Sequence, residues 1–365
     1  MTAQPNLAFR SLKSSHPTPQ AEREAIVANP GFGKYFTDHM VSIDWTLEQG
    51  WHDAALKPYG PLMLDPASSV LHYAQEIFEG LKAYRHPDGS IWTFRPEQNA
   101  ARMQRSATRL ALPPLPTDLF LESIKQLVAA DAAWVPGSGE MSLYIRPFMI
   151  ANESFLGVRS AHRAAYYVIA SPAGPYFAKG VAPVMIWLAE DHARAAYGGT
   201  GAAKCGGNYA ASLLPQQEAY ENGCPQVLFL DSQEGKYVEE LGGMNVFLVL
   251  KDGTLVTPEL TGSILEGVTR MSIIQLARDR GHQVQERKIT IDEWRDGIAS
   301  GEVAEAFACG TAAVVTPIAA LKGRGFIAGD EQAAAGKLTM SLRQELTDIQ
   351  SGRLPDRHGW LQRLV

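Results

Sequence analysis

Lys204 lies in an uncharged segment of small residues. Residues 198–209 read GGTGAAKCGGNY, with small residues before Lys204, and with Cys205 and two glycines after it. Desolvation in such surroundings disfavours the ammonium form of a lysine, and the neutral amine is a nucleophile that can form a Schiff base with a carbonyl group. The segment therefore indicates a reactive amine.

Three other interpretations of this segment exist. A P-loop has a glycine before its lysine and a serine or threonine after it, whereas Lys204 follows Ala203 and precedes Cys205. A dinucleotide-binding turn has its third glycine at the position that Lys204 occupies. Both phosphate-binding motifs are therefore weak matches, and an exposed lysine in a flexible loop stays open as the remaining alternative.

The composition limits the classes of protein. A chain of 365 residues favours two domains, and a net charge of -6 with 20% charged residues argues against a nucleic-acid partner. The polar start contains no apolar run long enough for a signal peptide or a membrane span, so we expect a cytoplasmic protein with no membrane partner. The three cysteines and nine histidines show no metal-ligand spacing, so we expect free thiols and no catalytic metal.

Two hydrophobic periods alternate along the chain. Runs rich in Tyr, Ile, Val and Phe predict strands at residues 90–94, 140–152, 164–174, 184–191, 226–231 and 304–318. Apolar residues on one helical face predict helices from residue 97 and at residues 119–128, 268–280, 291–299 and 338–349. Asn208 stands where the N-cap of a further helix is expected, and Asp252-Gly253 predicts a hairpin turn. Because hairpins and helices are interspersed, the pattern favours an α+β fold.

An imine of Lys204 needs a cofactor that draws electrons, and pyridoxal phosphate suits amino-acid chemistry. Its ring nitrogen needs a carboxylate, for which Glu239 and Glu240 are candidates, and strand alternation would turn one of them inward and the other to solvent. Its phosphate needs backbone donors, which the helix opening at LEGVTR, with Thr269, and the turn ACGTAA could supply. Surface glutamates and a plain tight turn are the alternatives.

Arginines on one predicted helix are similarly ambiguous. Arg102, Arg105 and Arg109 fall together at helical spacing, which usually makes a solvated face.

The order of these motifs resembles that of the branched-chain amino acid aminotransferases, which are pyridoxal-phosphate enzymes of fold type IV. The shared motifs are HYAQEIFEGLKAYR, LYIRPF, GGTGAAKCGGNYA, EELGGMN, GVTR and ACGTAA. The resemblance implies a two-domain, D-amino acid aminotransferase-like α+β fold. Its parts are a small N-terminal α+β domain at residues 1–173, a linker at residues 174–184 that contains GPYFAKGVAP, and a larger, mixed α/β, barrel-like C-terminal domain at residues 185–365.

The resemblance also implies a role for each matched position. Lys204 corresponds to the catalytic Schiff-base lysine, Tyr209 to the tyrosine at the phenolic oxygen of the cofactor, and Glu240 to the carboxylate at its ring nitrogen. The other cofactor-binding positions are Arg102, Arg194, Val268, Thr269 and Thr311. The substrate-binding positions are Tyr73, Phe78, Tyr144, Arg146, Tyr176, Thr311 and Ala312.

The implied reaction is reversible transamination of leucine, isoleucine and valine with 2-oxoglutarate, which gives branched 2-oxo acids and glutamate. The implied assembly is a homodimer in which a neighbouring subunit contributes to the substrate pocket. One pocket must then accept both an apolar side chain and a carboxylate, and Arg146 or a tyrosine hydroxyl is our hypothesis for the group that meets the carboxylate. The alternatives are a D-amino acid aminotransferase or aminodeoxychorismate lyase of the same fold, a phosphate-ligand binding protein without a catalytic lysine, and a structural protein with a Gly-rich loop.

Overall fold

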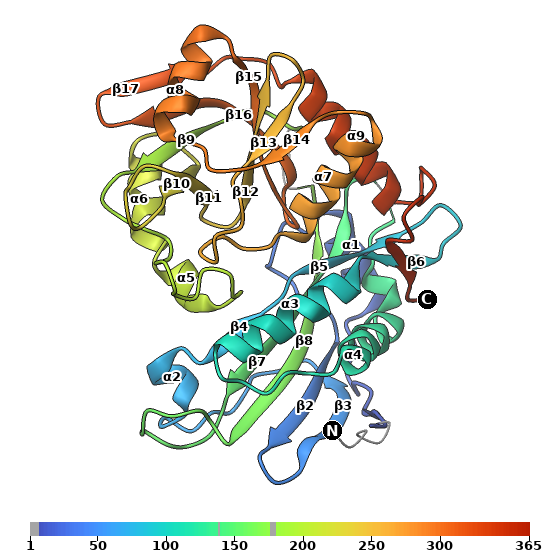
Figure 1. Cartoon of the computed structure of the whole chain (residues 1–365). Coiled ribbons are helices and arrows are strands. Elements are labelled where there is room, and N and C mark those ends of the chain that lie inside the picture. The colour runs from blue at the N-terminus through green and yellow to red at the C-terminus, as the bar shows by residue number, and fades with distance from the viewer. Residues whose placement is uncertain (1–6, 138, 176–179) are drawn as a thin grey trace. The chain divides into compact units, whose positions relative to one another are not determined.

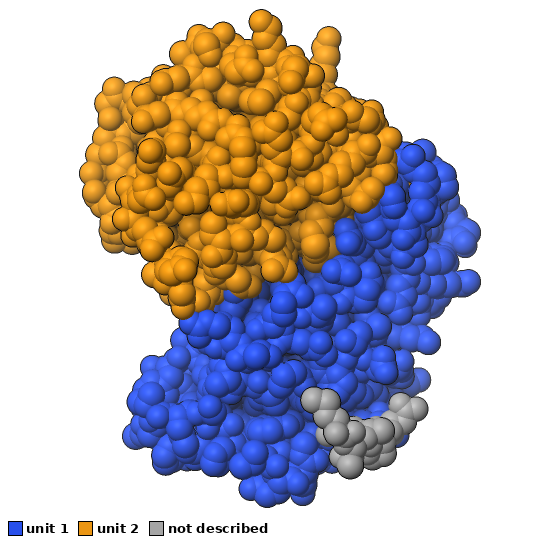
Figure 2. Space-filling model, viewed as in Figure 1, with its two compact units in different colours: residues 1–178, 203–206, 349–365 blue, residues 179–202, 207–348 orange. Residues whose placement is uncertain are grey.

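The computed structural model describes residues 7–137, 139–175 and 180–365, and the chain divides into two compact units. Figure 2 shows the two units in different colours. Unit 1 comprises Met1–Ala178, Ala203–Gly206 and Ile349–Val365, and unit 2 comprises Lys179–Ala202 and Gly207–Asp348. The short segment that contains Lys204 therefore belongs to unit 1, although most of its neighbours in sequence belong to unit 2.

Unit 1 is built on a nine-stranded sheet with the order β1-β3-β2-β8-β7-β5-β6-β18, in which β4 also pairs with β7 (Figure 1). Its strands are β1 (Arg10–Ser11), β2 (His39–Thr46), β3 (Gly50–Pro58), β4 (Glu76–Phe78), β5 (Leu81–Arg85), β6 (Ile91–Phe94), β7 (Ser142–Ala151), β8 (Arg163–Ala173) and β18 (Leu361–Arg363). The pairing is antiparallel except between β1 and β3. Side chains of each strand therefore alternate between two faces of the sheet.

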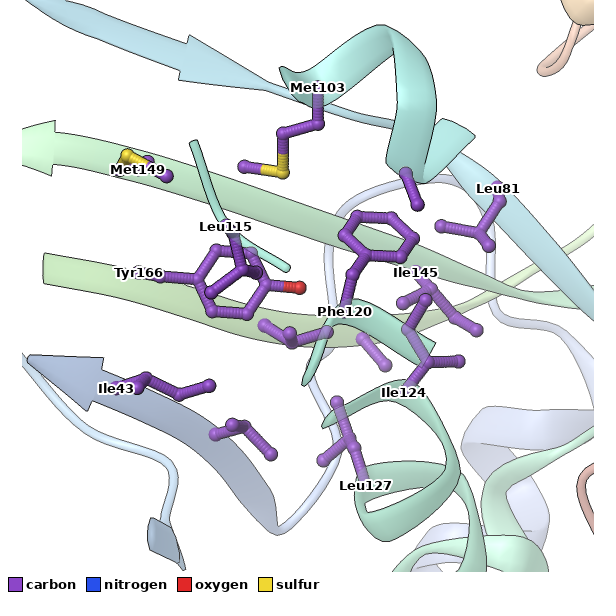
Figure 3. Packing of buried hydrophobic residues seen from close by; sticks show 14 of the residues in the cluster. Ile43, Leu81, Met103, Leu115, Phe120, Ile124, Leu127, Ile145, Met149 and Tyr166 are labelled. Carbon is purple, nitrogen blue, oxygen red and sulfur yellow. The ribbon is translucent and has the colours of Figure 1, made fainter. Parts of the chain in front are cut away.

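One face of this sheet is covered by helices. The helices of unit 1 are α1 (Gln20–Ala28), α2 (Ser69–Tyr73), α3 (Pro96–Arg109), α4 (Thr117–Ala130) and the 3-10 helix η1 (Ala132–Trp134). Met103 of α3 and Phe120 of α4 pack with Ile145 and Met149 of β7 in one buried apolar cluster (Figure 3). Because this face is filled, polar side chains of β4 and β7 can only point to the opposite face.

Unit 2 is built on a second nine-stranded sheet with the order β11-β10-β9-β16-β15-β12-β13-β14, in which β17 also pairs with β16. Its strands are β9 (Val184–Ala189), β10 (Gln226–Leu230), β11 (Val238–Leu241), β12 (Asn245–Leu250), β13 (Leu255–Thr257), β14 (Val284–Glu286), β15 (Val303–Gly310), β16 (Val314–Gly323) and β17 (Phe326–Gly329). Strand β9 runs parallel to both β10 and β16, whereas β15 is antiparallel to its neighbours. This sheet is therefore mixed.

The helices that begin at or after residue 206 are α5 (Gly206–Ala210), α6 (Leu213–Glu221), α7 (Val268–Asp279), α8 (Ile291–Ser300) and α9 (Lys337–Gln350). Local sequence explains the bounds of α8, because the hydroxyl of Thr290 accepts the N–H of Glu293 at its start and Gly301, with φ 75°, ends it. No helix of the described residues is long and apolar enough to cross a membrane.

Most predicted elements are confirmed, including the helices that correspond to α3, α4, α7, α8 and α9 and the turn at Gly253, which has φ 85°. Two predictions are wrong. Asn208 lies inside the short helix α5 rather than at an N-cap, because its side chain bonds back to Thr200, and α6 starts only at Leu213. The single strand predicted at residues 304–318 is a hairpin of β15 and β16, because Gly310 pairs with Val314 across the turn.

Candidate active site

The segment that carries Lys204 is fixed to β4 and α3 of unit 1. The backbone N–H of Lys204 donates to the Ser106 hydroxyl at 2.9 Å, and its carbonyl accepts the N–H of Phe78 at 3.0 Å. Two residues further on, the N–H of Gly206 donates to Oε1 of Glu76. Cys205 between them is buried in the apolar core of unit 1, which gives this cysteine a packing role. Lys204 is therefore half-buried and anchored, unlike a lysine of an exposed flexible loop.

The Lys204 amine lies on the sheet face opposite to α3 and α4. Nζ is 4.7 Å from the centre of the Phe78 ring. Phe78 is opposite Phe148 in the pairing of β4 with β7, so it shares a face with Tyr144 and Arg146 of β7. The structure thus brings together four of the predicted site residues, which are Phe78, Tyr144, Arg146 and Lys204.

Tyr144 lies directly over the backbone of Gly80. A Cβ atom at position 80 would overlap the Tyr144 hydroxyl, so the approach of the phenol depends on glycine there. The ring of Phe32 meets the Tyr144 ring edge-on at a centroid distance of 5.1 Å. Tyr144 is consequently held from two sides.

The guanidinium of Arg146 lies between aromatic rings and lacks a carboxylate partner among the described residues. Its Cζ is 4.8 Å from the centre of the Phe78 ring and 5.5 Å from that of Tyr144. Nη2 donates to the Tyr144 hydroxyl at 3.3 Å, whereas the buried Nε has no hydrogen-bond partner in the described part of the chain. A buried donor without a partner is costly, so this group is suited to an anionic ligand.

Arg102 is buried rather than solvated. Nε and Nη2 donate to the two carboxylate oxygens of Glu79 at 2.8 and 2.7 Å, and neither side chain is more than 5% exposed. Arg105 and Arg109 of the same helix are exposed, so the expectation of a common solvated face is wrong for Arg102. Glu79 is a residue that sequence reasoning missed, although a charge placed between apolar strand residues needs a buried partner and could have indicated one.

The predicted substrate-binding residue Tyr73 is not brought to this group. Tyr73 ends α2, is 42% exposed, and donates its hydroxyl hydrogen to the carbonyl of Leu156. Tyr176 lies outside the described residues. Their roles remain predictions.

Glu240 of β11 forms a buried ion pair with Arg194 in unit 2. Nη2 of Arg194 is 2.6 Å from Oε1 of Glu240, and the same oxygen accepts the N–H of Leu265 at 2.8 Å. Nη2 also donates to the carbonyls of Gly201 and Ser263 at 3.0 and 2.5 Å. A buried carboxylate with a fixed orientation is the group that a protonated ring nitrogen requires.

The neighbouring Glu239 does not face solvent, so the expected alternation of one buried and one exposed glutamate is wrong. Glu239 is 5% exposed because the segment before α7 covers it, and its Oε1 accepts the hydroxyl hydrogen of Ser263. Burial raises the pKa of Glu239, and the Ser263 hydrogen bond and the positive charge of Arg194 oppose that rise. Both faces of this strand end are therefore occupied by protein.

The remaining predicted cofactor positions also lie in unit 2. Val268 and Thr269 open α7 after its N-cap residue Gly267, which offers no side-chain hydrogen bond to the helix. Thr311 and Ala312 are half-buried in the turn between β15 and β16. Tyr209 of α5 lies beside Gly243, where an added Cβ would be 3.7 Å from the tyrosine ring. A helix N-terminus that no side chain caps leaves backbone donors for an anion such as a phosphate.

These groups fit pyridoxal phosphate by the chemistry of their donors. The anchored amine of Lys204 suits its aldehyde, the buried Glu240 carboxylate suits its ring nitrogen, and the start of α7 suits its phosphate. An anchored lysine, a buried carboxylate on a strand and an uncapped helix start are together the groups that a pyridoxal-phosphate enzyme requires.

Comparison with known proteins agrees with this class. Residues 76–321 match the family model for amino-transferase class IV. The branched-chain-amino-acid aminotransferase of Mycolicibacterium smegmatis is 57% identical over 98% of both chains, and the branched-chain-amino-acid transaminase 1 of Bacillus subtilis is 49% identical over 90% of this chain and 93% of that one. The crystal structure of the T.th. branched-chain amino acid aminotransferase with pyridoxamine 5'-phosphate superimposes with a TM-score of 0.74 at 29% identity, covering 89% of this chain and 99% of that chain.

The chain therefore belongs to the branched-chain amino acid aminotransferases of the class IV family. It is a pyridoxal-phosphate-dependent enzyme that transfers the amino group between branched-chain amino acids and 2-oxoglutarate. The predicted fold class, cofactor and reaction are confirmed.

Proposed function

We propose that Lys204 is the catalytic residue of this transamination. The observation that carries the proposal is the anchoring of its backbone to Ser106 and Phe78, which holds the amine 4.7 Å from the Phe78 ring on the sheet face opposite to α3 and α4. A pyridoxal phosphate bound there supplies an aldehyde that reacts with amines and a ring that withdraws electrons from the substrate Cα. Lys204 Nζ then takes the proton from the substrate Cα and returns it as a general acid.

Other residues hold the cofactor in this proposal. Glu240, oriented by Arg194, binds the ring nitrogen, and Tyr209 lies at the phenolic oxygen. The phosphate is bound by Arg102 and by the donors of Val268, Thr269 and Thr311. The burial of Glu240 and its ion pair with Arg194 support its assignment, because a carboxylate of fixed orientation can accept the hydrogen of a protonated ring nitrogen.

We propose that Arg146 binds the distal carboxylate of glutamate and 2-oxoglutarate, within a substrate pocket formed by Tyr73, Phe78, Tyr144, Arg146, Tyr176, Thr311 and Ala312. The buried Nε without a partner supports this role. Replacing Arg146 by alanine should raise the KM for 2-oxoglutarate at least tenfold, because a charge-assisted bidentate contact is lost, and should leave the KM for leucine within about threefold. If the variant turned over 2-oxoglutarate as well as wild type does, the proposed role of Arg146 would be wrong.

A visible absorption spectrum of the purified protein tests the central proposal. Wild type should show a band that shifts when leucine is added and returns when 2-oxoglutarate is added. Lys204→Ala should lose the band of the lysine-linked cofactor while remaining folded by circular dichroism. A Lys204→Ala variant that still exchanges both substrates at the wild-type rate would overturn the assignment.

We also propose a cytoplasmic homodimer whose two domains follow the expected residues 1–173 and 185–365, except that residues 203–206 and 349–365 belong with the first. Exposed apolar side chains, among them Met63 and Tyr73, support a subunit contact that brings Tyr73 to the pocket of a second copy. Sedimentation equilibrium should give twice the mass of the chain, which is 39.7 kDa. A monomer that retains full activity would contradict the dimer.

A further inference from the structure

Glu76 lies on the same sheet face as the proposed substrate residues. Strand β4 pairs with β7 so that Ile77 is opposite Met149, and both are part of the buried core. Because side chains alternate along a strand, Glu76 and Phe78 point to the other face, where Arg146 lies. Glu76 is thus an acidic residue on the surface that receives the substrate.

The carboxylate of Glu76 is held at one oxygen. Its Oε1 accepts the N–H of Gly206, two residues after Lys204, while its Oε2 has no hydrogen-bond partner among the described residues. The side chain is half-buried. Burial raises the pKa of Glu76, and the Gly206 hydrogen bond and the positive charge of Arg146 oppose that rise. Arg146 therefore acts on this carboxylate electrostatically without being paired to it.

Arg146 also has no carboxylate partner among the described residues. Its Nε is buried without a hydrogen-bond partner in the described part of the chain, and its only polar contact there is the 3.3 Å hydrogen bond to Tyr144. Glu76 and Arg146 are thus two opposite charges on one face, and each has a polar atom without a partner. Neither side chain forms an ion pair like the one that joins Arg102 to Glu79.

We propose that Glu76 determines dual substrate specificity as the alternate counter-ion of Arg146. Its carboxylate neutralises the guanidinium while an apolar side chain fills the pocket, and it gives up the guanidinium when the substrate brings a second carboxylate. This inference rests on the proposed role of Arg146 in binding that carboxylate. Glu76 acts through Arg146, so it is a positioning residue and does not take part in the proton transfer.

The physical reason is the cost of an unpaired charge next to an apolar ligand. A leucine side chain excludes water from the guanidinium without offering it an acceptor, and a desolvated cation needs a counter-ion. Glutamate supplies its own carboxylate, so the same pocket then needs no charge from the protein. Because Gly206 continues to donate to Oε1 of Glu76, the released carboxylate keeps one partner.

Equilibrium binding of two competitive ligands to the cofactor-loaded enzyme tests the inference. The ligands are glutarate, which carries a second carboxylate, and 4-methylvalerate, which carries a branched apolar chain. Glu76→Gln retains an oxygen that accepts the Gly206 N–H and removes only the charge. We expect tighter glutarate binding and weaker 4-methylvalerate binding, with the ratio of the two dissociation constants shifted by about tenfold or more. The kinetic counterpart is a lower KM for glutamate and a higher KM for leucine with similar kcat.

Three comparisons keep the test decisive. Glu140→Gln, an exposed change of the same charge in unit 1, should leave the ratio unchanged. In an Arg146→Met background, Glu76→Gln should no longer shift the ratio, because the charge that it balances is gone. If Glu76→Gln fails to load cofactor, Glu76→Asp, which keeps the charge, should hold the ratio within about twofold of wild type.

Equal weakening of both ligands by Glu76→Gln would overturn the inference, because it would show that Glu76 only anchors the Lys204 segment. Failure of the proposed function is a different result. In that case wild type itself would show no preference for glutarate that depends on Arg146, or no spectral response to leucine.

Discussion

Units 1 and 2 each bury one arginine–glutamate pair, and the two pairs are built differently. In unit 1, Arg102 donates to both oxygens of Glu79 through two nitrogens, and Asn99 donates to the same carboxylate at 2.8 Å. Both oxygens of this carboxylate therefore accept hydrogen bonds from residues of α3, and we call such a pair closed. Such a pair fixes a helix to a sheet, because moving either element breaks several charge-assisted hydrogen bonds together.

In the pair of unit 2, the arginine is shared between the carboxylate and other acceptors, so we call this pair shared. Nη2 of Arg194 serves Glu240 and two backbone carbonyls, and its buried Nε has no hydrogen-bond partner in the described residues. A second carboxylate, Glu239, lies next to the pair in sequence and is also buried. Burial alone therefore does not define the role of an ion pair, since the pair of unit 1 fixes Arg102 and its helix to the sheet, whereas the pair of unit 2 orients a carboxylate for a ligand.

Glu79→Gln should give the largest loss of stability. The amide removes the charge that balances Arg102 and leaves a guanidinium buried without its counter-ion, which costs about 3–5 kcal/mol of the free energy of unfolding. Urea denaturation followed by tryptophan fluorescence measures the loss. Glu97→Gln, an exposed change on the same helix, should stay within about 0.5 kcal/mol of wild type. A loss below about 1 kcal/mol for Glu79→Gln would show that the pair of unit 1 does not hold the fold.

Arg194→Met should cost less stability and more cofactor affinity. Glu240 keeps the hydrogen bond from Leu265, so we expect a loss of about 2–3 kcal/mol, together with at least tenfold weaker pyridoxal phosphate binding in a fluorescence titration. Arg278→Met, at a half-exposed arginine of the same unit, is the matched control and should change neither value appreciably. An equal loss of stability in Arg194→Met and Glu79→Gln, with unchanged cofactor affinity, would erase the distinction between the two pairs.

Local patterns in the sequence account for the elements but not for these pairs. Helices α3 and α7 are predictable because their buried residues recur at helical spacing, and the turn at Gly253 is predictable because Asp-Gly has few other conformations open to it. The prediction of an N-cap at Asn208 is wrong because the Asn208 side chain bonds to Thr200. The spacing of apolar residues along the sequence gives no sign of that contact.

The site residues also differ in how well the sequence alone predicts them. Lys204 is recognisable from its small neighbours, whereas the burial of Arg102 depends on Glu79, which lies 23 residues away in sequence. Helical spacing alone put Arg102 with the exposed Arg105, since a period of 3.6 does not define which side of the helix meets the sheet. Glu239 likewise needs the covering Ser263 to be identified as buried.

Asn99→Ala should have a smaller effect than either charge removal. It takes one donor from the Glu79 carboxylate and keeps the bidentate contact to Arg102, so we expect a loss of about 1.5–2 kcal/mol. Gln98→Ala, its half-buried neighbour on the same helix, should cost under about 0.5 kcal/mol. A double-mutant cycle with Glu79→Gln should show strong coupling, and additive losses would mean that Asn99 does not belong to the closed network of unit 1.

Glu239→Gln should have the smallest effect at low pH and should become stabilising as the pH rises. Burial raises the pKa of Glu239 above its usual 4.5, so folding favours the protonated carboxyl. The contribution of this group is fully present below pH 4.5 and is lost as the pH rises through the raised pKa, because the buried carboxylate must then carry a charge. Glutamine is neutral throughout and can still accept the hydroxyl hydrogen of Ser263.

The difference in the free energy of unfolding between Glu239→Gln and wild type is therefore expected to be flat in acid and to grow in favour of the variant toward pH 8. Parallel urea titrations between pH 4 and pH 8 measure it, with the exposed Glu234→Gln as the control for a surface carboxyl. The opposite trend, in which the variant loses stability as the pH rises, would mean that Glu239 is held as an anion by Arg194. The pair of unit 2 would then be a closed three-residue network, and the contrast with Arg102 and Glu79 would disappear.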